Sequence, residues 1–323
     1  MKHLSLLLVS LFIFVSCNET NERDKSLLSK SVGNINVLQV VIENDLWNGE
    51  VGEEIRNYFA APTDGLPQDE PIFSMNQMPA EAFTGFARKS RLILHVSLGD
   101  ENKASIAKDN FAKPQTIAYV TGKTKEDLVQ QIASKQEQIV TAFHDSEIKE
   151  RQRRTLKSPL DLDSLKQDFG VTMKIPSAYH IAKKNKDVYW IRKELEAGST
   201  NIIIYQVPLE TIGNDSIIGD IIKMRDSIGG KLLPVEDGGH FQTEKAYAPF
   251  LFESELDGKF AYETKGTWDV TDQYMAGPFL NYAVRDEKNN RYLILEGFTY
   301  APQVRKRDLQ FELESILKSA KID

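Results

Sequence analysis

The first 17 residues determine where the folded part of this chain can begin. Lys2 and His3 are followed by an apolar run over residues 4–15, and then by Ser16 and Cys17, the only cysteine. A run of about 12 residues suits the hydrophobic region of a secretory signal peptide, because a helix that crosses a bilayer needs about 20. We therefore expect residues 1–16 to be a cleaved signal peptide, so that the mature chain begins at residue 17.

Cys17 stands where bacterial lipoproteins carry their acylated cysteine. A lone thiol in an oxidising envelope has no disulfide partner, and acylation would remove this liability. Each buried methylene contributes about 0.8 kcal/mol, so two or three acyl chains would anchor the protein firmly in a lipid bilayer. Because residue 18 is Asn and not Asp, we expect the outer membrane of the cell envelope. The alternative is an ordinary secretory signal with an incidental cysteine.

The rest of the chain divides into a tether and two domains. Residues 17–32 are polar and lack periodicity, which predicts a flexible tether behind the lipidated cysteine. Residues 33–155 and residues 159–323 are each long enough to bury a core. The boundary is placed after a long charged helix, where Pro159 prevents the helix from continuing.

Hydrophobic periodicity predicts the α+β class, with a mainly antiparallel sheet packed with helices in each domain. The first domain is expected to contain strands at 34–42, 72–75, 91–98 and 115–121 and helices at 49–59 and 124–154. The second is expected to contain helices at 161–169, 215–228 and 309–320, strands at 171–175, 188–192 and 201–207, and antiparallel hairpins within 250–300.

The sequence contains no recognisable catalytic or metal-binding motif. None of the histidines His95, His144, His180 and His240 has a second ligand at metal-binding spacing, and no G-x-S-x-G segment is present. The segment Gly122-Lys123-Thr124 lacks the preceding glycine of a phosphate-binding loop. We therefore expect no catalytic residue, no metal and no cofactor. An enzyme is the less favoured reading.

Two regions are candidate binding surfaces. The loop at residues 61–71 contains three prolines, which lower the entropy lost on binding, and we select Leu66, Gln68 and Phe73 there as contact residues. The alternative is that Leu66 and Phe73 hold the loop to its own domain. The aromatic region at 241–300 supplies Trp268 and Tyr274 as candidates for binding a glycan or peptide, although such residues more often fill a core.

Three long segments resemble a family of uncharacterised Bacteroidetes lipoproteins that is classed as a domain of unknown function. They are VVIENDLWNGEVGEEIRNYF at residues 40–59, LPQDEPIFSM at residues 66–75 and FGVTMKIPSAYHIAKKNKDVYWIRKE at residues 169–194. The resemblance extends over most of the mature chain. It implies location and lineage, and it supplies no site residues.

These observations favour a membrane-anchored envelope protein that binds or assists a protein partner within an outer-membrane assembly. The alternatives are a periplasmic hydrolase with a site that forms no sequence motif, and a carrier of a glycan or small ligand. The full chain has a formal net charge of −7, and removal of the signal segment makes the charge one unit more negative because it takes away one lysine. An acidic chain without a basic run is not expected to bind nucleic acid.

The lipidation hypothesis predicts that Cys17→Ala abolishes incorporation of a fatty-acid analogue, because no other thiol is present. Metabolic labelling followed by gel fluorescence measures this, with Ser16→Ala as the control that keeps a small residue before the cysteine. Equal labelling of the wild type and the Cys17 variant would contradict the assignment.

Overall fold

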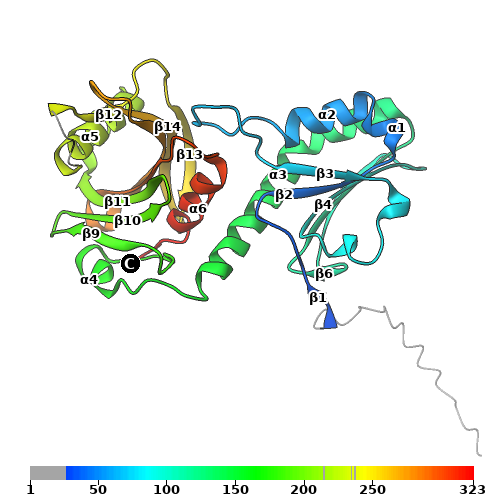
Figure 1. Ribbon diagram of the computed structural model, residues 1–323, viewed down its shortest axis with the longest axis horizontal. Coiled ribbons are helices and arrows are strands. Elements are labelled where there is room, and N and C mark those ends of the chain that lie inside the picture. The colour runs from blue at the N-terminus through cyan, green and yellow to red at the C-terminus, as the bar shows by residue number, and fades with distance from the viewer. Residues whose placement is uncertain (1–26, 214, 234, 236–237) are drawn as a thin grey trace, which may run out of the picture.

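The computed structural model of the chain describes residues 27–213, 215–233, 235 and 238–323. Cys17, the predicted signal peptide and the part of the predicted tether before residue 27 lie outside the described residues. Figure 1 shows two domains joined by one long helix, α3 (Lys125–Thr155). Among the described residues, no helix is both long and apolar enough to cross a bilayer.

The first domain contains a five-stranded sheet in the order β3-β2-β4-β7-β5. These strands are β2 (Val37–Val41), β3 (Ser74–Met78), β4 (Leu92–Leu98), β5 (Lys103–Lys108) and β7 (Thr116–Gly122). The helices are α1 (Asn44–Trp47), α2 (Glu50–Phe59) and the first half of α3. A short parallel pair, β1 (Ser29–Lys30) with β6 (Ala112–Lys113), lies beside this sheet. The predicted tether at residues 17–32 is therefore too long at its end, because residues 29–32 form backbone hydrogen bonds or bridges with the first domain.

The pairing within this sheet corrects one expectation. The chain as a whole is α+β with mainly antiparallel pairing, as predicted, but β2 pairs parallel with both β3 and β4, and β4 pairs parallel with β7. Only β5 is antiparallel, to β7. Helices α1 and α2 carry the chain back after β2, and a helical crossover of this kind leads into a parallel neighbour.

Helices α2 and α3 pack on one face of the first sheet. Their apolar side chains, among them Ile55, Phe59 and Phe143, bury against Leu38, Leu94 and other residues of the strands. Helix α3 begins where predicted, because the Thr124 hydroxyl accepts a hydrogen bond from Asp127 N at 3.1 Å and caps the helix.

A buried ion pair joins α3 to the start of the first domain. Arg91 Nη2 lies 2.9 Å from Glu147 Oε2, and the two side chains are 2% and 0% exposed. The same carboxylate accepts a hydrogen bond from Asn36 N at 2.7 Å, while Arg91 Nη2 donates to Asn34 O at 2.7 Å. The segment that enters β2 is therefore held to both α3 and β4.

The second domain contains an eight-stranded antiparallel sheet in the order β12-β14-β15-β16-β11-β10-β9, with β13 also pairing with β14. The strands are β9 (His180–Lys184), β10 (Val188–Leu195), β11 (Gly198–Pro208), β12 (Phe241–Thr243), β13 (Phe250–Leu256), β14 (Lys259–Val270), β15 (Ala276–Asp286) and β16 (Arg291–Tyr300). A separate pair joins β8 (Val171–Thr172) to β17 (Lys321–Ile322).

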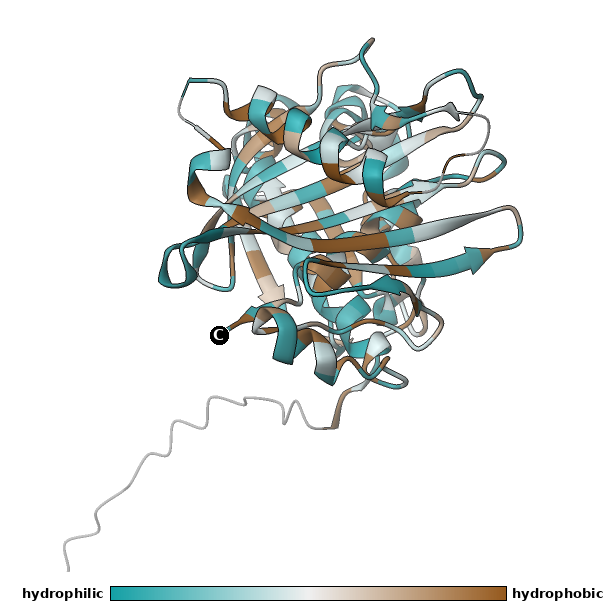
Figure 2. Cartoon of the chain, turned by 90° about the vertical axis from the view of Figure 1, so that its left-hand side faces the viewer, coloured by the Kyte–Doolittle hydropathy of each residue, from teal (hydrophilic) through white to brown (hydrophobic). Residues whose placement is uncertain are grey.

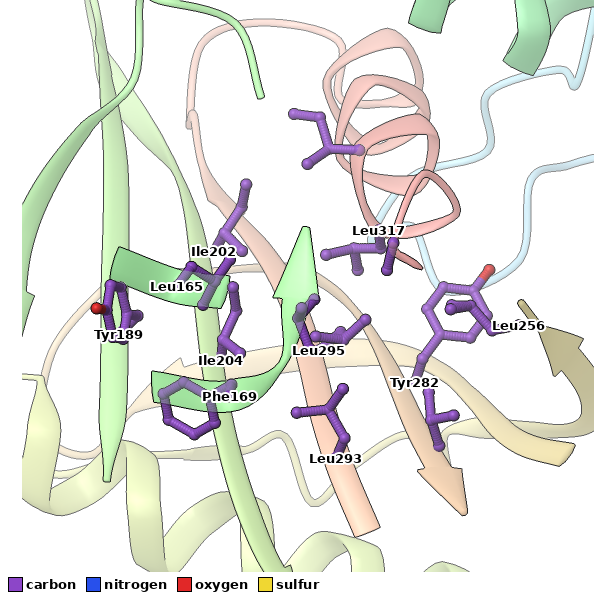
Figure 3. Packing of buried hydrophobic residues seen from close by; sticks show 14 of the residues in the cluster. Leu165, Phe169, Tyr189, Ile202, Ile204, Leu256, Tyr282, Leu293, Leu295 and Leu317 are labelled. Carbon is purple, nitrogen blue, oxygen red and sulfur yellow. The ribbon is translucent and has the colours of Figure 1, made fainter. Parts of the chain in front are cut away.

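Helices cover both faces of this sheet. One face packs against α4 (Asp163–Phe169) and α6 (Arg307–Leu317), and Figure 3 shows Leu165 and Phe169 from α4 and Leu317 from α6 around the strand residues. The other face packs against α5 (Ile217–Leu232). In Figure 2 the helices carry both hydrophilic and hydrophobic stretches, as expected for helices with one buried face.

Replacing Glu147 by Ala should destabilise the chain by about 3–5 kcal/mol, because it leaves the buried Arg91 guanidinium without its counter-charge. Denaturant unfolding measures the change. The exposed Lys149→Ala on the same helix is the matched control and should change stability by less than about 0.5 kcal/mol. Similar losses for both variants would show that the pair has no special role.

Candidate site between the two domains

The loop at residues 61–71 crosses from the first domain to the second, as Figure 1 shows. At its end, the buried Glu70 accepts hydrogen bonds from the backbone N–H groups of Lys306 and Arg307, at 2.7 and 3.1 Å. These groups open α6, so the carboxylate caps that helix and interacts favourably with its dipole. Gly65 lies against β14, where an added Cβ would come 2.8 Å from Gly266 N.

Helix α6 also binds α3 through its polar side chains. Glu312 forms an ion pair with Arg151, and Gln152 donates a hydrogen bond to Ser315 O at 3.0 Å. About two helical turns earlier on α3, His144 Nε2 lies 3.1 Å from Glu314 Oε2. The same helix therefore contributes to the second core and fixes the first domain beside it.

A cavity of about 340 Å³ lies between these contacts, with walls from both domains. Leu66, Ile72 and Phe73 come from the loop and the residues that follow it. Val140 comes from α3 and Phe311 from α6. This volume is at the lower end of the range for small-molecule sites, about 300–1,000 Å³.

Charged side chains lie beside the apolar walls. Lys318 Nζ is 2.9 Å from Glu314 Oε1, and Lys265 Nζ is 2.9 Å from Glu263 Oε1. Tyr282 is fully buried below them. Two acids and two bases thus form a compact network that is neutral overall when all four are ionised.

The electrostatics keep this network ionised. Burial raises the pKa of Glu314, but attraction from His144, Lys318 and Lys265 outweighs it and holds the pKa well below its usual value. Burial lowers the pKa of Lys265 and of Lys318, yet attraction to Glu314 and Glu263 leaves both above the usual value. Burial, with Glu314 and Glu263 nearby, raises the pKa of Tyr282 far above normal.

These directions indicate what the cavity can do chemically. A general acid or base works best with a pKa near the working pH, and these shifts move the acid, the two amines and the phenol away from neutrality. The arrangement is suited to holding a ligand by fixed charges and apolar walls. Within the described part of the chain, no group of three or more His, Cys, Asp or Glu side chains could hold a metal ion.

The residues selected from the sequence are distributed over four places. Leu66 and Phe73 line the cavity together, although Phe73 is only 2% exposed and is mostly part of the first core. Gln68 is exposed on the loop and does not line the cavity. Trp268 is buried in the second domain, where it lines a different hollow, and Tyr274 is fully exposed on the turn after β14. The loop's own contacts are with the other domain of the same chain.

Sequence reasoning missed the charged residues of the cavity. His144 and Glu314 are 170 positions apart, and Lys265 and Lys318 belong to different elements. No motif spacing connects residues that meet only when two domains dock. The one available signal was Glu70, a carboxylate at the end of a proline-rich loop.

Two family comparisons cover most of the chain. Residues 158–319 match a domain of unknown function, DUF4837, and residues 31–156 match a second domain of unknown function, DUF8532. No curated protein matches the chain. The resemblance to a family of unknown function is thereby confirmed, while the Bacteroidetes origin stays a prediction. Because the first match spans half of the 323 residues, the chain belongs to the DUF4837 family.

Proposed function

We propose that this protein is a lipid-anchored envelope protein that binds a small molecule between its two domains. The observation that carries the proposal is the interdomain cavity, whose apolar walls adjoin a network of paired acidic and basic side chains. Such a lining favours a ligand with an apolar body and a charged or hydrogen-bonding end. The segment before Cys17 supports anchoring in the outer membrane.

Binding is favoured over hydrolysis by the state of the charged groups. Glu314 and Glu263 balance the charges of Lys318 and Lys265, and the pKa of Glu314, Lys318 and Lys265 is in each case shifted in the direction that preserves the charge. These three groups are therefore poor proton donors and acceptors near neutral pH. Fixed charges are instead preorganised to orient a ligand, because their geometry is already set before it arrives.

A bulky side chain inside the cavity should remove the ligand. Thr141 is exposed on α3 and lines the cavity, so Thr141→Trp should reduce occupancy about tenfold or more, equivalent to about 1.4 kcal/mol. The measurement is native mass spectrometry of the full chain purified from its own membranes in mild detergent. Gln138→Trp, exposed on the same helix and not part of the lining, is the control and should keep the bound mass.

Two results would refute this proposal. One is the absence of any bound small molecule on the wild type. The other is equal occupancy in the wild type and Thr141→Trp.

A second candidate function is docking of an extended segment from an envelope protein partner at β13. This strand pairs with β14 along one edge, and its other edge faces no strand among the described residues. Phe250 and Phe252 on it are 48% and 39% exposed, and their rings stack with centroids 6.3 Å apart. A free strand edge beside exposed aromatic rings is suited to the addition of a partner strand.

The paired substitution Phe250→Asp and Phe252→Asp should abolish partner binding while changing stability by less than about 1 kcal/mol, since both rings are partly solvated. Hydrogen exchange with and without the co-purified partner should show protection of the β13 amides in the wild type only. Phe86→Asp, which removes a 72% exposed ring in the first domain, is the control. Unprotected β13 amides in the wild-type complex would exclude this edge as the docking site.

A further inference from the structure

An aromatic groove of about 510 Å³ crosses one end of the second sheet. Its lining includes Trp190, Arg192, Asn201, Trp268 and Tyr300. None of these residues lines the interdomain cavity. The groove is therefore a separate feature of the second domain and needs its own explanation.

Strand register brings these residues onto one face of the sheet. Trp268 pairs with Gly277, Tyr300 pairs with Ser199, and Ser199 pairs with Glu194, so their side chains form a row across five strands. This is the face that carries α5 further along, but no α5 residue lines the groove. Leu233 and Val235, which follow α5, do line it, so the segment after the helix borders this end of the face.

Gly277 keeps this row open at its centre. A Cβ at this position would lie 3.2 Å from Trp268 Nε1 and 1.9 Å from Thr299 O. Without it, the indole of Trp268 can lie close to Tyr300, with ring centroids 6.3 Å apart. Trp268 is 2% exposed and forms the base of the groove, whereas Trp190 and Tyr300 are only half-buried and present accessible ring surface.

The polar side chains around these rings are already held in place. Trp190 Nε1 donates a hydrogen bond to Asn201 Oδ1 at 3.0 Å, and Asn201 Nδ2 donates to Ser199 Oγ at 3.0 Å. Arg192 Nη2 donates to Glu194 Oε2 at 3.0 Å, and its guanidinium lies 5.8 Å from the Trp190 ring. The groove is thus rigid and rich in hydrogen-bonding atoms, and the charges of Arg192 and Glu194 cancel.

We propose that this groove binds a pyranose unit of a neutral glycan. A sugar ring has apolar C–H faces that pack on aromatic rings and a rim of hydroxyl groups that exchange hydrogen bonds with amide, carboxylate and guanidinium groups. A charged ligand gains little here because Arg192 and Glu194 already neutralise each other. A planar aromatic compound would pack on the rings but could not exchange hydrogen bonds with the polar groups.

Binding can be measured directly, because two of the three tryptophans of the chain line the groove. The full chain, solubilised in detergent, is applied to an array of neutral and charged bacterial glycans, and hits are titrated by tryptophan fluorescence. We expect a neutral glycan to bind, and Trp190→Ala to weaken it at least tenfold. Trp47→Ala, which removes the tryptophan of the first domain, should leave the affinity unchanged.

A second variant covers the case in which Trp190→Ala disturbs folding. Glu194 is 59% exposed, so Glu194→Ala should preserve the melting temperature while weakening the glycan about tenfold. The proposal is overturned if no array glycan binds, if both variants bind as the wild type, or if indole binds more tightly than any glycan. Thr141→Trp should not affect this binding, so the result is independent of the interdomain cavity.

Discussion

The structure depends most on the contacts of α6, which belongs to one domain and is fixed by the other. Leu313, Ile316 and Leu317 bury against the second sheet, while Glu312 and Glu314 reach toward α3. Its N-terminus is capped by Glu70, which lies more than 230 positions earlier in the chain. Every residue from position 310 to 317 is buried as a result. Charged side chains that are desolvated in this way stabilise the folded state only when each one has a partner of opposite charge. Because α3 supplies partners to Glu312 and Glu314, α6 requires the first domain to be docked in one orientation.

This docking explains why the cavity has both apolar walls and a charged side. The walls are the ends of two hydrophobic cores, which meet without filling the space between them. The charged side consists of groups that α6 and β14 present to the interface, such as Glu314 and Lys265. Proteins form ligand sites at domain interfaces for this reason, since neither core can close the gap alone. A ligand that fills the cavity would add contacts to both domains and would favour the docked arrangement.

Much of the fold could be predicted from the sequence, because strong periodicity reports local structure. The pattern of Leu128, Ile132, Ile139 and Phe143 predicted α3, and the β-branched run before Ile42 predicted β2. Strand β5 was missed because its sequence KASIAK has a weak pattern. The parallel pairing of β2 was missed because the sequence of one strand does not specify which other strand pairs with it. Both hollows depend on docking or register, which bring Trp190 and Trp268 into one groove although 78 positions separate them.

The proposed anchor gives the two domains different positions relative to the membrane. The chain enters the first domain at β1, and the Arg91–Glu147 pair holds the following residues 33–36 against α3 and β4. The second domain is joined to the first through α3, a helix of 31 residues that spans about 45 Å. A flexible tether over residues 17–28, as the sequence predicts, would have a root-mean-square end-to-end distance of about 20 Å. On the proposed anchoring, the first domain therefore lies on average closer to the lipid than the second domain does.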